Sequence, residues 1–414
     1  MRHHMTMEAS KATAVLEQRL ATYPADRYPV QHGTAQFHLG VTLLDAGRVA
    51  EAQAALKAAA RLLDPRHLPV EHAKATNALG AALRQAGDPA RAAEAFRGAA
   101  QAFASAGQAP EEGAALFNLG LVQREIGDGE AAVASFGRAA ELFDPRRAPA
   151  HAGAAARERG AGLLELGCTD EAVAALEEAV ALAERAGDSA SLGAAANALG
   201  LAHLAAGGIE AALEALRAAT GAHPRTVRPA EHAMAKANLA LAYEQAGDAV
   251  RARLAARQAL AVPGAALPVR EQAEGILDRL GAPAGDLLRV LDDEPSERWL
   301  ALVREELVRW VDTPDTERRA EARAWIDGEL ARAESGPVLA GALLEGLLEL
   351  PPPGLNALIE SLLEALGDAD ATIQGRFASE LGRAMAAFHL PQEQRLRESF
   401  NRVAADLGQD PSWS

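Results

Sequence analysis

Residues 79–99 read LGAALRQAGDPARAAEAFRGA, and this stretch contains the features that decide the fold. Its first glycine, Gly80, is small enough to let two helices approach closely. Its second, Gly87, stands where a helix must end, because glycine takes a positive φ without steric cost. Asp88-Pro89 then supplies an N-cap and a first-turn proline for a new helix. The stretch therefore predicts a helix, a glycine turn and a second helix.

The same pattern returns every forty residues, which indicates an array of helix pairs. The first small-residue column reads Leu39-Gly40, Leu79-Gly80, Leu119-Gly120, Gly160, Leu199-Gly200 and Leu239-Ala240. The turn glycines are Gly47, Gly87, Gly127, Gly167, Gly207 and Gly247. Three further columns begin at Ala52, Leu56 and Ala59, and their i, i+4, i+7 spacing places them on one face of the second helix.

In these columns the chain resembles the tetratricopeptide repeat family, whose pattern is small-Gly-Ala-aromatic-Ala. Two departures are visible: the aromatic residue early in the first helix is replaced by Gln36, Thr76 and Leu116, and the tyrosine column is kept only at Tyr243. The forty-residue period is similar to that of the longer repeats of kinesin light chains. The resemblance implies an all-α, right-handed superhelical array.

The repeat and its loss divide the chain into four expected segments. Composition supports helix throughout, because aromatic residues make up only 4% of a chain that is 49% hydrophobic. The expected segments are a disordered N-terminus over 1–7, the repeat array over 8–282, an acidic C-terminal helical bundle over 283–407 and a disordered tail over 408–414. Within the array we expect a lone helix over 8–23, six full repeats and a last helix over 268–281.

The C-terminal segment has its own composition and charge. Residues 285–414 carry 13 basic and 25 acidic side chains, and all four tryptophans lie in this part of the chain. Such a bundle could serve as a cap, as a second docking surface or as a homo-oligomerisation module, with an ordinary packed core as the plainer reading. Its expected helices are 295–311, 313–334, 336–350, 355–366, 369–388 and 391–407.

Charge and cysteine content limit the classes of partner. The formal net charge of −16 argues against nucleic acid, because a polyanion requires a basic footprint. No signal peptide and no run of about 18 apolar residues is visible, so we expect no membrane partner. The single cysteine, Cys168, fits a reducing compartment, and a cytoplasmic protein is the expectation.

If the resemblance holds, the second, fifth, ninth and twelfth positions of each repeat unit, all in its first helix, line a groove. Four basic side chains among them could hold an acidic peptide or a carboxylate, since arginine binds carboxylates with two parallel hydrogen bonds. The plainer alternative is that they are scattered solvated charges. The candidate residues for peptide binding are Lys74, Asn77, Arg84, Phe117, Arg124, Arg157 and Asn197.

No pattern for catalysis, a cofactor or a metal site stands out. Cys168 has no indicated His or Asn partner, and there is no phosphate-binding, dinucleotide or zinc-protease signature. His32, His72 and His232 share one register, but they lie in separate repeats about 10 Å or more apart, so they predict contacts at helix starts. We therefore expect a non-catalytic scaffold or adaptor that binds a segment of another protein. Two alternatives stay open: a sensor whose array changes shape on binding, and an enzyme with its site in the C-terminal bundle.

Overall fold

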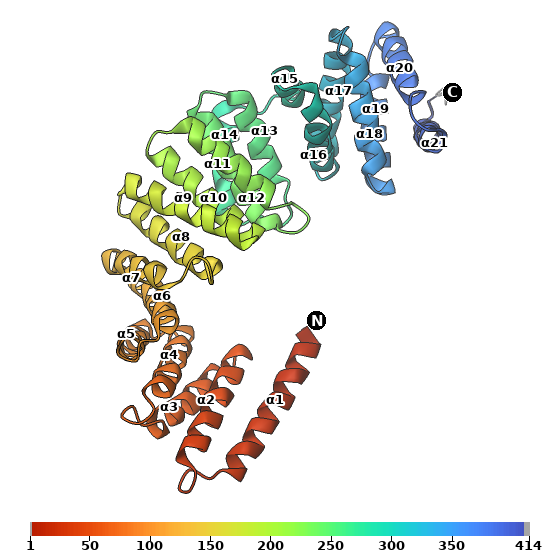
Figure 1. The fold of residues 1–414 in the computed structure, drawn as a ribbon. Helices are drawn as coiled ribbons and strands as arrows, with labels where there is room; N and C mark the ends of the chain where they lie inside the picture. Colours follow the sequence, from red (N-terminus) through yellow and green to blue (C-terminus); the bar gives the residue numbers. More distant parts are fainter. Residues whose placement is uncertain (1, 410–414) are drawn as a thin grey trace. The chain divides into compact units, whose positions relative to one another are not determined.

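The computed structural model describes residues 2–409, and in that range the chain forms helices and connecting turns without any strand (Figure 1). The all-α expectation is therefore confirmed. The chain forms two compact units, residues 1–222 and 223–414, and each is described by itself. The first unit contains α1 (Arg2–Thr22), α2 (Pro29–Asp45), α3 (Val49–Leu62), α4 (Pro69–Gln85), α5 (Pro89–Ser105), α6 (Ala109–Glu125), α7 (Gly129–Leu142), α8 (Pro149–Glu165), α9 (Thr169–Ala186), α10 (Ser189–Ala205) and α11 (Ile209–Ala222).

The lone N-terminal helix is longer than the sequence indicated. Residues 2–7 were expected to be disordered, but they form the beginning of α1. The physical reason is that this stretch has neither glycine nor proline, and Met5, Met7 and Glu8 have good helix propensity. No helix-breaking residue therefore separates residues 2–7 from the rest of α1, which begins at Arg2.

The helices of the first unit alternate between two layers. In each repeat the first helix (helix A: α2, α4, α6, α8 and α10) packs against the second (helix B: α3, α5, α7, α9 and α11) and against the preceding helix B. Helix A also contacts helix A of the next repeat in three cases, α2 with α4, α4 with α6 and α8 with α10. In the described part of the chain, no two neighbouring B helices pack together as closely as these A helices do. The A helices therefore line the inner side of the stack, as expected for a helical repeat array.

Glycine makes the contact between helix A and helix B possible in the five repeats of the first unit. A Cβ atom added to Gly160 would lie 2.5 Å from Cγ of Leu176, and one added to Gly40 would lie 2.5 Å from Cγ of Leu56. Real carbon atoms do not approach so closely, so helix A can touch the apolar side chain of helix B only where its own side chain is absent. The turn glycines serve a different purpose: Gly87 has φ 78°, which a residue with a Cβ rarely adopts.

The second unit contains the last repeat and the C-terminal helices. Its elements are α12 (Pro229–Gln245), α13 (Ala249–Leu260), α14 (Leu267–Leu280), α15 (Asp286–Asp292), η1 (Ser296–Arg298), α16 (Trp299–Val311), α17 (Asp315–Ala331), α18 (Gly336–Glu349), α19 (Pro352–Gly367), α20 (Ala371–Met385) and α21 (Leu390–Asp406). The sequence missed α15, which has only seven residues and shows no clear periodicity. It also placed the start of α19 three residues late, because prolines fit a first helical turn.

The C-terminal helices pack in two rows of alternate elements. One row is α16, α18 and α20, and the other is α17, α19 and α21. Both rows enclose one apolar core that includes Trp310, Trp325, Leu343, Ile359 and Phe400. The expected helical bundle thus takes the form of a short stack in which each helix contacts the second helix along the chain.

The structure bears on two expected segment limits, the domain boundary at residue 283 and the start of the C-terminal tail at residue 408. The compact units meet at residues 222–223, inside the repeat array, so the domain boundary expected at residue 283 from the loss of the repeat stays a prediction. In the tail expected over 408–414, Gln409 donates a hydrogen bond of 3.2 Å from Nε2 to the carbonyl oxygen of Leu363. Residues 410–414 lie outside the described part of the chain.

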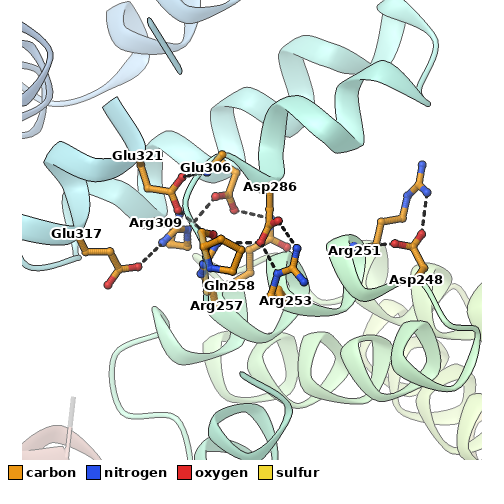
Figure 2. Close-up of polar contacts among 12 residues, drawn as sticks. Asp248, Arg251, Arg253, Arg257, Gln258, Asp286, Glu306, Arg309, Glu317 and Glu321 are labelled. Carbon is orange, nitrogen blue, oxygen red and sulfur yellow. Dashed lines mark hydrogen bonds and ion pairs between the residues drawn. The ribbon is translucent and has the colours of Figure 1, made fainter. Parts of the chain in front are cut away.

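A buried ionic cluster joins α13 to the C-terminal helices within the second unit (Figure 2). Asp286, whose side chain is fully buried, accepts hydrogen bonds from Nε and Nη2 of Arg253 at 2.9 and 2.6 Å. Arg257 donates to the same carboxylate at 3.1 Å and to the carbonyl oxygen of Pro283 at 2.6 Å. Each charge in this group therefore has an opposite partner, which burial requires.

The cluster continues through Arg309, whose side chain is also buried. Its Nε donates to Glu306 at 2.8 Å and its Nη2 donates to Glu321 at 2.9 Å, while Gln258 donates to Glu306 at 2.7 Å. In the repeats of the first unit, residues equivalent to Arg257 and Gln258 lie on the outer surface of helix B and are at least partly solvent-accessible. The C-terminal helices therefore cover the outer side of α13.

A separate buried carboxyl lies among α17, α18 and α20. Glu329 accepts a hydrogen bond of 2.7 Å from Nε1 of Trp325, but its Oε1 has no partner in the described structure. Burial raises the pKa of Glu329 from its ordinary 4.5 to about 8; the Trp325 hydrogen bond opposes the rise, and the negative charge of Glu380 adds to it. Glu329 is therefore protonated in the folded protein at neutral pH.

We predict that Gly160→Ala destabilises the first unit. The new methyl group collides with Leu176, and overpacking of this kind costs about 1–3 kcal/mol of unfolding free energy. The matched control is Gly98→Ala on α5, where an added Cβ meets nothing within 4 Å and helix propensity favours alanine by up to about 1 kcal/mol. Urea denaturation followed by circular dichroism should move the two midpoints in opposite directions. Equal shifts would contradict the close-contact explanation.

We predict that Asp286→Asn destabilises the second unit by about 2–4 kcal/mol, because it leaves the buried guanidinium groups of Arg253 and Arg257 without their carboxylate. Asp292→Asn is the control, since it removes a carboxylate from a half-exposed pair with Arg332 and should cost less than about 1 kcal/mol. Hydrogen exchange of α13 and α15 measures the difference. If the amides of α13 and α15 were equally protected from exchange in both variants, the cluster would contribute little to the stability of the second unit.

We predict that the stability of the second unit falls as pH rises from about 4.5 to 8. In this window the folded state holds a proton on Glu329 that the unfolded state has lost, so unfolding is favoured as pH increases. One pKa unit corresponds to about 1.4 kcal/mol, which gives an upper limit of about 5 kcal/mol. Glu329→Gln should match the native protein near pH 4.5 and exceed its unfolding free energy by roughly 1–4 kcal/mol at pH 9. A constant difference across pH would refute the assignment.

Candidate protein-binding surface

The A helices of the first three repeats form a cavity on the inner layer of the first unit. It has a volume of about 180 Å³, and two of the seven candidate residues, Lys74 and Asn77 of α4, lie in its wall. Aromatic rings and alanines provide most of the remaining surface. The lining residues are Phe37, Lys74, Asn77, Ala78, Phe103, Glu111 and Ala114.

A second cavity lies one repeat further along the same layer. Its volume is about 210 Å³, and a third candidate residue, Phe117 of α6, lines it. Ala114 lines both cavities, so the two are neighbours on either side of this residue. The lining residues are Ala114, Phe117, Asn118, Phe143, His151 and Ala154.

The repeat register explains why the cavities form here. Lys74, Ala114 and Ala154 occupy the same position of the A helix in successive repeats, and the two alanines leave space beside larger rings. Phe143 comes from the end of α7 and packs against His151 with ring centroids 5.3 Å apart. Phe117 packs edge-on against the buried Phe136 at 5.6 Å. The cavity walls are therefore held in place by the repeat cores.

Two polar groups of the first cavity have unused binding capacity. Lys74 is exposed and has no ion-pair or hydrogen-bond partner among residues 2–409. Asn77 is half-buried, and its Oδ1 has no hydrogen-bond partner in the described structure. Glu111 faces them from α6. The cavity thus combines an apolar interior with one cation, one anion and one free amide acceptor.

The three candidate arginines are engaged in ion pairs along the A helices. Arg84 of α4 pairs with Glu125 of α6 at 2.6 Å, and Arg124 of α6 pairs with Glu158 of α8 at 2.5 Å. Arg157 donates to the same carboxylate of Glu158 at 2.8 Å. These side chains are about one-third exposed and line neither cavity. Two glutamates face the three arginines, so most of this positive charge is compensated before any partner binds.

The last candidate, Asn197, is placed apart from the others. It is buried in α10 with a relative exposure of 6% and lines neither cavity. The structure therefore brings together Lys74 and Asn77, adds Phe117 in the adjoining cavity, and leaves the remaining four candidates outside.

Three aromatic residues of this surface were missed by the sequence analysis. Phe37 stands in the same column as Asn77 and Phe117, forty residues earlier, so a complete reading of that column would have found it. Phe103 and Phe143 end B helices, and their contribution to an inner surface depends on how neighbouring repeats pack. No local sequence signal marks them.

The other candidate groups have structural roles or none. His32, His72 and His232 each place Nδ1 within 2.8–2.9 Å of the carbonyl oxygen nine residues earlier, which confirms the expected contacts at helix starts. Cys168 is exposed at the N-terminus of α9 and makes no capping hydrogen bond. Within residues 2–409, no group of His, Cys, Asp and Glu is arranged to hold a metal ion. The same residues contain no helix with the length and apolarity that a membrane crossing requires.

Several known structures match part of the chain at low sequence identity. BtubC (BKLC) from P. vanneervenii is 19% identical, with 53% of this chain and 90% of that chain covered and a TM-score of 0.45. A putative kinesin light chain from Podosopora anserina, with nearly identical TPR-like repeats, is 20% identical over 51% and 96% of the chains, with a TM-score of 0.40. YrrB, described as a TPR protein with an unusual peptide-binding site, is 21% identical over 49% and 88%, with a TM-score of 0.36. No curated protein sequence matches the chain.

The repeat itself is matched by a known sequence family. The family model of the tetratricopeptide repeat matches residues 37–107, 77–152 and 197–266. These segments contain the glycine, alanine and apolar columns whose packing is described above, including the contacts of Gly40 and Gly80 with helix B. Residues 37–152 and 197–266 of the chain are therefore tetratricopeptide repeats.

Proposed function

We propose that this protein is a non-catalytic scaffold or adaptor that binds a segment of another protein on the A-helix layer of its first unit. The observation that carries the proposal is the pair of adjoining cavities between α2, α4, α6 and α8, which share Ala114. Their walls are mostly apolar, with a few polar groups, and this is the usual make-up of a recognition site.

The apolar lining of the cavities favours a binding role. Phe37 and Phe117 are partly exposed there, and the buried rings of Phe103 and Phe143 form part of the cavity walls. The unpaired ammonium group of Lys74 and the free acceptor of Asn77 add polar specificity to one of the two cavities.

The sequence analysis expected a partner with an acidic segment, and in this proposal only Lys74 contacts an acidic group of that partner. Arg84, Arg124 and Arg157 already face glutamates, so an acidic partner would have to displace existing ion pairs to use them. Lys74 has no such competitor among the described residues. A single carboxylate of the partner, placed beside the first cavity, is therefore the form of acidic recognition that we propose.

We predict that Lys74→Glu weakens capture of the native partner by roughly two- to tenfold, because an exposed ion pair contributes up to about 1 kcal/mol and its reversal adds repulsion. Affinity capture from the native cell with quantitative mass spectrometry measures the change. Lys57→Glu on α3 is the matched control, since it alters net charge equally but lies on a B helix. If both variants captured equal amounts of the partner, the binding surface would not include Lys74 of α4.

A further inference from the structure

We propose that the first cavity, whose walls come from α2, α4, α5 and α6, binds one free α-amino acid with an aliphatic side chain. The observations that carry this inference lie around one cavity of about 180 Å³: two opposite charges without partners, an amide oxygen without a hydrogen bond, and an apolar wall. The inference shares this cavity with the proposed function, but it concerns a small molecule that binds to the chain alone.

Two side chains of opposite charge line the cavity without pairing with each other. Lys74 of α4 and Glu111 of α6 have no ion-pair or hydrogen-bond partner among residues 2–409. Elsewhere on the same two helices, opposite charges within reach pair directly, as Arg84 does with Glu125. The cavity therefore keeps one cation and one anion apart, and a ligand that carries both a carboxylate and an ammonium group satisfies both of them.

Asn77 places a third polar group close to Lys74. The two residues are three apart on α4, and such pairs are neighbours on one helix face, with Cβ atoms about 5–6 Å apart. Oδ1 of Asn77 is buried and has no hydrogen-bond partner in the described structure, so it requires a donor. An α-amino acid carries its carboxylate and its ammonium group on one carbon atom. Its carboxylate can thus face Lys74 while the three N–H donors of its ammonium group serve Asn77 and Glu111.

The rest of the wall selects an aliphatic side chain. The apolar lining residues are Phe37, Ala78, Phe103 and Ala114. Among the described residues, no further charged group lines the cavity to pair with a charged ligand side chain.

The size of the cavity selects a molecule as small as one amino acid. Its volume corresponds to roughly six water molecules at about 30 Å³ each. It lies below the range of about 300–1,000 Å³ that is typical of drug-sized ligands and cofactors. An amino acid such as leucine or methionine suits this volume, and burial of its side chain against the apolar wall favours binding.

The test is isothermal titration calorimetry of the purified full chain with L-leucine and two analogues that each lack one charge. L-Leucinamide has no carboxylate, and N-acetyl-L-leucine has no ammonium group. We expect L-leucine to bind with a dissociation constant below about 1 mM and each analogue to bind at least about fivefold more weakly, because each leaves one charge of the cavity unpaired. Equal binding of L-leucine and either analogue overturns the inference. It is also overturned if none of L-valine, L-leucine and L-methionine binds.

Two variants assign the charges of the ligand to the two side chains. Lys74→Met should weaken L-leucine binding by at least about threefold but leave the affinity for L-leucinamide unchanged, since this analogue has no carboxylate. Glu111→Gln should have the same effect on L-leucine and leave N-acetyl-L-leucine unaffected. The matched controls are Lys57→Met on α3 and Glu94→Gln on α5, which remove the same charges outside the cavity. Equal effects of the cavity variants and their controls contradict the site.

The amino-acid site and the proposed function can fail separately. If Lys74→Glu lowers capture of the native partner but no aliphatic amino acid binds to the purified chain, the scaffold proposal stands and the amino-acid site is wrong. If L-leucine binds with the expected dependence on both charges but partner capture does not depend on Lys74, the amino-acid site stands and the proposed binding surface is wrong.

Discussion

The close approach of helix A to helix B is the constraint on which the array depends. Gly160 touches Leu176 at a distance that leaves no room for a Cβ atom, and Gly40 does the same with Leu56. The apolar face of helix B is buried mainly by alanine and leucine, so little area is available per residue and close contact must compensate. A constant contact in each pair gives a constant step between repeats, and a constant step brings the A helices together on one side.

The candidate binding surface follows from positions that this constraint leaves free. The residues that hold the pairs together are nearly uniform from repeat to repeat, whereas the inward column containing Phe37, Asn77 and Phe117 varies. Where this column and the ends of B helices supply rings, and alanine stands beside them, cavities form. Where the inner layer carries Arg124 and Glu158, ion pairs close the surface instead. The surface of the inner layer thus differs from repeat to repeat, while the same columns hold each helix pair together.

In the second unit, buried ion pairs join the last repeat to the C-terminal helices. Arg257 of α13 stands where the other repeats have a solvated surface, and Arg253 stands where they contact the next helix A; Asp286 and Glu321 neutralise both arginines in the interior. Buried ion pairs contribute little net stability, because desolvation offsets attraction, yet they tolerate no missing partner. Such a cluster fixes which helices cover α13. Glu329 shows the opposite case, a buried carboxyl without a cation, which keeps its proton and makes stability depend on pH.

The sequence alone determined the helix pairs, their period and most helix limits, because glycine turns, caps and apolar columns act over a few residues. The resemblance to the repeat family added the expectation that Lys74, Asn77 and Phe117 lie on the inner layer. Only the tertiary structure decided that Arg84 and Arg124 are paired, since their partners Glu125 and Glu158 lie on the first helix of the next repeat. It likewise decided that Phe103 and Phe143 line cavities, because a cavity is produced by the packing of several repeats and not by any one of them.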